Sequence, residues 1–157
     1  MTPSGPQAHG IELPNRLKHK PVALLPYEAH DGPYIGDTDC RYLSVGWAQY
    51  DPRTLSAKAL RYTNGRWSRQ SEELPLHRAI DLTVLIVHTL QASLADGRVD
   101  IAPLTLEHQD GPLTLTLTCQ TAEERTLFDA LIQDPLVRRR LTKLADALGE
   151  LRTRGEI

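Results

Sequence analysis

The sequence predicts a small α+β domain with an antiparallel sheet of about five strands and helices packed on one face of that sheet. Two Asx-Gly pairs, Asn64-Gly65 and Asp110-Gly111, each lie between segments of strand character, which is typical of antiparallel hairpins. A long apolar segment with helical spacing separates the two pairs, and two further helical patterns follow residue 120. The predicted element order is therefore βββ-α-ββ-α-α.

The composition is that of a globular protein and excludes several other classes. Hydrophobic residues make up 40% and charged residues 24% of the 157 positions, which suits a single domain. The formal net charge of −2 gives no electrostatic reason to expect binding to nucleic acid or to an anionic membrane. The longest apolar stretch falls short of the ~20 residues that span a bilayer.

Residues 1–10 lack the apolar run of a signal peptide. Neither Cys40 nor Cys119 has a second ligand at a zinc-type spacing, so we expect both to be thiols of a reducing compartment. These observations predict a cytoplasmic protein.

The first part of the chain contains an arm, a short strand and a long loop. Residues 1–20 lack periodicity and are expected to form a flexible N-terminal arm, with residues 21–157 as the single α+β domain. A short strand is predicted over 22–25. Residues 26–39 are rich in Gly, Pro, Asp and Tyr, which predicts a long surface loop, and such loops are often functional.

Three strands are predicted around the first hairpin, over 42–50, over 56–63 and from residue 66 onward. If Asn64-Gly65 forms a two-residue turn, Tyr62 lies opposite Trp67 on the neighbouring strand. Such a cross-strand aromatic pair fixes the register of the hairpin.

A helix is predicted from Pro75 to Leu94, because proline suits the first helical position and Gly97 suits the end. One broad apolar face is expected to cover the core: Leu76, Ala79, Ile80, Leu82, Thr83, Ile86, Val87, Leu90 and Leu94.

The second hairpin is predicted to join residues 104–108 to residues 113–119 through Asp110-Gly111. In that register one face is leucine and buried: Leu104, Leu106, Leu113, Leu115 and Leu117. The other face is polar and exposed: Thr105, Thr114 and Thr116.

Two helices are predicted to end the chain. A capping box at Thr121 opens a helix that runs to about residue 133, and Asp134 caps the last helix. In the last helix the apolar residues form a narrow seam at spacings of four and three: Val137, Leu141, Leu144, Leu148 and Leu151. This seam can cover the chain's own sheet or pair with another copy, which would give a homodimer through the C-terminal helix.

Residues 67–78 read W-S-R-Q-S-E-E-L-P-L-H-R, and residues 18–21 before them read K-H-K-P. Together these segments resemble a family of small bacterial proteins grouped as a domain of unknown function. The resemblance covers roughly residues 15–95. It implies a bacterial cytosolic protein and carries no activity with it.

The segment from Arg61 to Asp81 is the candidate functional site. The predicted third strand, residues 66–70, has no aliphatic residue, although a sheet strand normally offers one face to the core. Polar side chains gather at the strand-to-helix junction beside Trp67: Arg61, Arg69, Gln70, Ser71, Glu72, Glu73, His77 and Arg78. A helix start beside arginines is typical of anion sites.

Three interpretations of this junction stay open. The protein is a binding or accessory module that holds a small anionic ligand or a protein partner through four side chains: Arg61, Trp67, Arg69 and Arg78. Alternatively, it is an enzyme that acts on a small anionic or phosphorylated substrate, with Glu73 or His77 as acid or base. In the third interpretation, the charges form a structural ion-pair network. The sequence does not decide whether the protein is an enzyme.

No cofactor or metal is expected. His77 and Asp81 share a helix face with His88, but His88 lies about 10 Å further along the axis, too far to share one ion. The loop pair Asp37 and Asp39 resembles a divalent-cation site without further ligands.

Common enzyme signatures such as Gly-x-Ser-x-Gly are absent from the sequence. The run 138–140 of three arginines is too short to favour nucleic acid.

Overall fold

A computed structural model describes residues 7–8, 11–12, 17–68 and 74–157. The chain divides into two compact units, residues 1–119 and residues 120–157, and each is described by itself. Residues 1–6, 9–10 and 13–16 of the predicted arm lie outside the described residues. Within that arm, β1 (Gln7–Ala8) and β2 (Ile11–Glu12) form an antiparallel pair.

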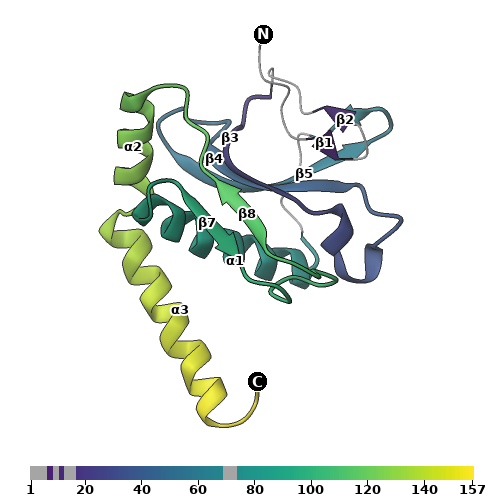
Figure 1. Ribbon diagram of the computed structural model, residues 1–157, viewed down its shortest axis with the longest axis vertical. Helices are drawn as coiled ribbons and strands as arrows, with labels where there is room; N and C mark the ends of the chain where they lie inside the picture. Colours follow the sequence, from purple (N-terminus) through teal and green to yellow (C-terminus); the bar gives the residue numbers. More distant parts are fainter. Residues whose placement is uncertain (1–6, 9–10, 13–16, 69–73) are drawn as a thin grey trace. The chain divides into compact units, whose positions relative to one another are not determined.

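The first unit is built on a four-stranded antiparallel sheet in the order β3-β4-β5-β6 (Figure 1). Its strands are β3 (Lys20–Pro26), β4 (Cys40–Trp47), β5 (Leu55–Thr63) and β6 (Arg66–Trp67). All of β4 except Arg41 is buried, so this central strand forms the middle of the core. With the helices described below, the sheet confirms the predicted α+β class.

The structure confirms the turn, the strand register and the aromatic pair of the first predicted hairpin. Asn64 and Gly65 have φ values of 54° and 76°, as a type I′ turn requires. Tyr62 pairs with Trp67 across the strands, and the two ring centroids lie 5.3 Å apart in an edge-on arrangement. The aromatic pair therefore anchors the short strand β6 to β5.

The loop between β3 and β4 contains two single-turn 3₁₀ helices, η1 (Glu28–His30) and η2 (Gly32–Tyr34). Two contacts attach this loop to distant parts of the unit. The Tyr27 hydroxyl donates to Asp81 Oδ2 on α1 at 2.5 Å, and the His30 ring donates from Nδ1 to the carbonyl of Glu107 at 2.7 Å. The predicted long loop is thus held against the body of the unit.

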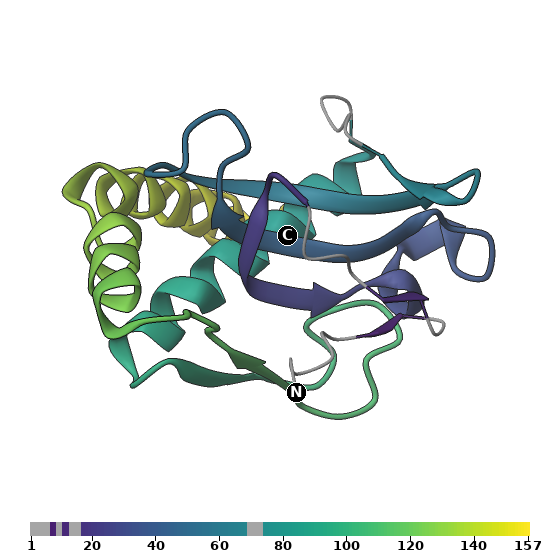
Figure 2. The same cartoon turned by 90° about the horizontal axis from the view of Figure 1, so that it is seen from above.

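Helix α1 (Leu76–Leu94) begins one residue later than predicted, with Pro75 as its N-cap, ends as predicted and lies on one face of the sheet (Figure 2). Its predicted core face is wrong, because Leu82 is the only member of that face that is buried. The buried stripe is instead Arg78, Leu82, Leu85, Thr89, Ala92 and Ser93. Polar residues enter it because they find partners there: Thr89, for example, donates its hydroxyl to the Leu85 carbonyl at 2.7 Å.

The second predicted hairpin is wrong in its first strand. The structure pairs β7 (Arg98–Ile101) with β8 (Leu113–Thr116), so that Val99 lies opposite Leu115. Residues 102–112 form the connection, and Leu104 in it is 83% exposed. Leu106, Leu115 and Leu117 are buried as predicted, and the threonines 105, 114 and 116 are exposed.

Gln109 organises this eleven-residue connection from the inside. Its side chain is buried, and its Nε2 donates to the carbonyls of Ile101 at 3.0 Å and Gly111 at 2.9 Å. Its Oε1 accepts from the Leu106 N–H at 3.0 Å. These bonds replace the strand pairing that the sequence predicted for residues 104–108.

The second unit contains α2 (Ala122–Ile132) and α3 (Pro135–Thr153). Both predicted caps are confirmed: Thr121 accepts from the Glu124 N–H, and Asp134 accepts from the Leu136 N–H. No residue of α3 is buried. The surface that the α3 seam covers therefore stays a prediction. Among the described residues, no helix is both long and apolar enough to cross a membrane.

Candidate functional site

A buried carboxylate, Asp31, lies at the centre of the candidate site. The Arg78 guanidinium donates two hydrogen bonds to Asp31, from Nε to Oδ1 at 2.9 Å and from Nη2 to Oδ2 at 2.7 Å. His77 Nε2 lies 2.8 Å from Oδ1, and the Thr38 hydroxyl donates to Oδ2. Asp31 is fully buried, whereas the His77 side chain is 29% exposed.

Local backbone geometry brings these groups together. Helix α1 begins directly after Pro75, so its first turn directs His77 and Arg78 at the η1–η2 loop that carries Asp31. Gly32 in that loop has a φ of +50°, and a Cβ there would lie 3.1 Å from His77 Cδ2. Glycine is therefore favoured at position 32, because a Cβ would strain this backbone conformation and press against the His77 ring.

The charges of this cluster are mutually stabilised. Burial raises the pKa of Asp31, but hydrogen bonds from Arg78, Thr38 and His77 outweigh burial and hold that pKa below its usual value. Burial lowers the pKa of Arg78, and its bond to Asp31 reverses the effect, so the guanidinium stays charged. Burial raises the pKa of the neighbouring Cys40 thiol to about 12, which leaves it a poor nucleophile.

A second carboxylate, Asp39, joins Arg61 to the cluster. Its Oδ2 lies 3.1 Å from Arg61 Nη1 and accepts from the Thr63 hydroxyl, also at 3.1 Å. Its Oδ1 lies 3.6 Å from Arg78 Nη2. The structure therefore brings Arg61 and Arg78 together, as the sequence predicts, but with the protein's own carboxylates between them.

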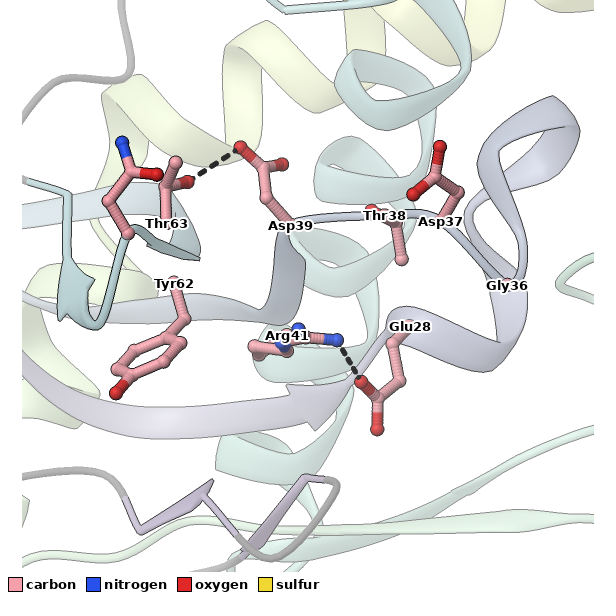
Figure 3. Close-up of a pocket in the computed structure, with 9 residues that line it drawn as sticks. Glu28, Gly36, Asp37, Thr38, Asp39, Arg41, Tyr62 and Thr63 are labelled. Atoms are coloured by element: carbon pink, nitrogen blue, oxygen red, sulfur yellow. Dashed lines mark hydrogen bonds and ion pairs between the residues drawn. The ribbon is translucent and has the colours of Figure 1, made fainter.

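A polar pocket of about 400 Å³ opens beside Asp39 (Figure 3). It is lined by nine residues: Glu28, Gly36, Asp37, Thr38, Asp39, Arg41, Tyr62, Thr63 and Asn64. Three of these are carboxylates and one is a guanidinium, and Arg41 Nη1 already lies 2.7 Å from Glu28 Oε2. The exposed carboxylate of Asp37 is on the rim. The lining therefore favours ligands that donate hydrogen bonds or carry positive charge.

The other predicted site residues are placed as follows. Trp67 packs its ring against Tyr42 and Tyr62, with centroids 6.1 and 5.3 Å away, and it is not among the residues that line the pocket. Arg69 and Glu73 lie outside the described residues.

The sequence analysis missed the residues that organise the site, above all Asp31 and Thr38. Both belong to the long loop over 26–39, whose Gly, Pro and Asp content was the available signal. The Tyr34 ring also comes from this loop and lies 5.7 Å from the His77 ring and 5.6 Å from the Arg78 guanidinium carbon. The loop could be singled out from the sequence, but its partners on α1 could not.

The side chains considered as metal ligands have separate partners. His77 binds Asp31, Asp81 accepts from Tyr27, and His88 donates from Nδ1 to the Val84 carbonyl at 2.8 Å. Burial raises the pKa of Asp81. Across the part of the chain that the structure describes, no three His, Cys, Asp or Glu residues are placed to hold a metal ion together.

The fold and the site define an α+β protein with a carboxylate–arginine network behind a polar pocket. The chain belongs to a family of unknown function, DUF6530, whose model matches residues 11–99. This match confirms the resemblance to a family without known activity. The matched segment includes both the Asp31 cluster and the pocket, and it ends within β7. Neither the curated proteins nor the solved structures contain a match to this chain.

Proposed function

We propose that the protein is a bacterial cytoplasmic binding or accessory module whose working surface is the pocket beside Asp39. One observation carries the proposal: the pocket wall formed by Thr38 and Asp39 is fixed from behind by Arg78 and Arg61. A wall that is held before the ligand arrives lowers the entropy lost on binding. Arg61 and Arg78 are then positioning residues rather than anion clamps, because both guanidinium groups already bind carboxylates.

The ligand that suits this pocket is small and polar and carries hydrogen-bond donors or a positive charge. Glu28 and Asp39 are matched by arginines, whereas Asp37 adds an exposed carboxylate at the rim. A cationic group on the ligand would complement that carboxylate, and the hydroxyl of Thr63 and the amide of Asn64 could bind its polar groups.

Amide chemical shifts of the full chain test this proposal with two probes, L-arginine and inorganic phosphate. L-Arginine should shift the signals of Thr38, Asp39 and Asn64 to saturation, and phosphate should leave them unchanged. Asp37→Asn should weaken the arginine effect about three- to five-fold, because an exposed ion pair is worth up to about 1 kcal/mol. The matched control is Asp110→Asn, an exposed carboxylate outside the pocket, which should bind as the natural chain does.

Two results would contradict the pocket proposal. Saturable phosphate shifts centred on Arg61 and Arg78 would favour the anion clamp instead. Arginine shifts spread evenly over the surface would mean that the pocket has no role in binding.

One observation favours a second function, that of an enzyme with His77 as acid or base. His77 Nε2 is bound to the buried Asp31, and part of the ring reaches solvent. A carboxylate that orients an accessible imidazole is a recurring arrangement in general acid–base catalysis. Glu73, the other expected acid or base, lies outside the described residues.

Turnover of p-nitrophenyl acetate and p-nitrophenyl phosphate tests this second function. If His77 is the base, His77→Gln should reduce turnover about 100-fold or more, because glutamine keeps an N–H donor for Asp31 but cannot exchange a proton. His88→Gln, on the same helix, should keep full turnover. Background rates in the natural chain, or equal losses in both variants, would count against catalysis by His77.

A further inference from the structure

Arg41 supplies the guanidinium in the pocket wall, and most of its N–H donors have no partner. Nη1 lies 2.7 Å from Glu28 Oε2, and this is the one side-chain bond that Arg41 makes to a described residue. Its Nε is buried, and no acceptor among the described residues lies within hydrogen-bond distance of it. A buried donor without an acceptor is costly, so Nε indicates a partner that the described part of the chain does not supply.

The shape of the guanidinium tells what kind of partner fits. The N–H groups of Nε and Nη2 point in parallel along one edge, and two oxygens of a carboxylate can accept both. Figure 3 shows the Arg41 side chain turned toward Glu28, which binds Nη1 and leaves the Nε edge to a ligand. Since Nε is buried, we expect a small rotation of the guanidinium to accompany the binding of that carboxylate.

Asp37 sets the opposite requirement in the same pocket. Its carboxylate is exposed at the rim and makes no side-chain bond to another described residue. A cationic group is the partner that complements it. The pocket thus contains unpartnered donors of an arginine and an unpartnered carboxylate, and one small ligand satisfies both only if it carries both charges.

We propose that the pocket binds a small zwitterion of the amino-acid class, with its carboxylate on the Nε edge of Arg41 and its cationic group at Asp37. This inference rests on the proposed function and deepens it, because that function requires only a polar ligand with donors or a positive charge. The three carboxylates and one guanidinium of the lining have a formal charge of −2. They would repel a free anion such as phosphate, whereas a carboxylate joined to a cation brings its own compensating charge.

L-Arginine and agmatine test the inference, because agmatine is L-arginine without the carboxylate. Amide-shift titrations of the full chain should show agmatine binding at least about ten-fold more weakly than L-arginine, since it lacks the charge-assisted bonds to Arg41. Electrostatic attraction alone gives the opposite order, because agmatine carries two positive charges and no negative one.

The variant Arg41→Lys assigns the preference to the guanidinium edge. Lysine keeps the positive charge but has no pair of parallel donors, so L-arginine should fall to the affinity of agmatine, whose own affinity should change less than about two-fold. The matched control is Arg53→Lys, which changes an exposed arginine outside the pocket lining and should keep the natural preference. The amide spectrum itself shows whether each variant is folded, and the comparison of the two ligands on the natural chain does not need the variants.

The possible failures separate this inference from the proposed function. Agmatine that binds to the pocket as tightly as L-arginine, or more tightly, would overturn the zwitterion and leave the proposed function intact, because the pocket would then recognise the cation alone. A preference for L-arginine that survives Arg41→Lys would also overturn the inference, since the carboxylate would bind elsewhere. Saturable binding of neither ligand would overturn both proposals.

Discussion

Replacing Asp31 with alanine should lower the free energy of unfolding by about 3–5 kcal/mol, the usual cost of removing one member of a buried ion pair. Arg78 would keep its charge in the interior, and its strongest partner would be lost. His77 and Thr38 would lose their common acceptor as well. Urea unfolding at neutral pH, followed by circular dichroism, measures the change.

The matched control for Asp31→Ala is Asp37→Asn, which changes an exposed carboxylate of the same loop and should stay within about 0.5 kcal/mol. The double variant Asp31→Leu with Arg78→Met should recover part of the loss, because it replaces the pair with apolar side chains. A cost below about 1 kcal/mol for Asp31→Ala would mean that water reaches the pair and that the network does not fix the pocket wall.

Of the two Asx-Gly pairs in the sequence, one forms the predicted hairpin and the other does not. Asn64-Gly65 determined its hairpin because the flanking residues can all donate to a strand ladder. Asp110-Gly111 did not, since Pro112 follows it directly and lacks the N–H that strand pairing needs, and since Leu104 and His108 before it have positive φ values of 61° and 54°. The chain instead pairs 98–101 with 113–116, and Gln109 fills the connection between them. Pro112 was the signal in the sequence against a two-residue turn at Asp110-Gly111.

The face of α1 could not be chosen from periodicity alone. Two stripes of the helix have helical spacing, and the more apolar one is not the buried one. The buried stripe contains Arg78 and Thr89, neither of which belongs to the face predicted from the sequence. Arg78 is buried only because Asp31, forty-seven residues earlier, supplies its partner. Spacing within a helix carries no information on partners at that distance in sequence.

The same limit applies to the candidate site. The sequence correctly grouped Arg61 and Arg78, because both lie near one strand-to-helix junction. It did not find Asp31, and it considered Asp39 only with Asp37 as a cation pair, because both partners of the arginines come from the preceding loop. Arginines without visible partners in the sequence therefore predicted a site for an external anionic ligand. In the structure, the chain's own carboxylates bind these arginines instead.

His19 is a buried titratable group whose protonation should affect stability between pH 7 and 4. Its side chain lies between two serines, with Nε2 2.8 Å from Ser44 Oγ and Nδ1 3.2 Å from Ser56 Oγ, and the residue is 2% exposed. Burial, and secondarily the positive charge of Lys58, lower the pKa of His19 from 6.5 to about 4. The imidazole is therefore neutral in the folded protein at neutral pH.

Lowering the pH from 7 to 4 should reduce the free energy of unfolding by about 3 kcal/mol through His19 alone, since each pKa unit corresponds to about 1.4 kcal/mol. The unfolded chain takes up the proton near pH 6.5, whereas folded His19 resists it until about pH 4. The stabilisation is thus complete above pH 6.5 and is lost as the pH falls through this window. Urea midpoints at closely spaced pH values between 7 and 4 measure it.

The variant His19→Gln isolates this effect, because glutamine can bond to both serines but does not titrate. It will have its own stability at pH 7, but its free energy of unfolding should fall by about 3 kcal/mol less than that of the natural chain between pH 7 and 4. His108→Asn, which removes an exposed histidine, should keep the natural pH dependence. Parallel pH curves for His19→Gln and the natural chain would contradict the prediction, because the imidazole would then be protonated in the folded state as easily as in the unfolded chain.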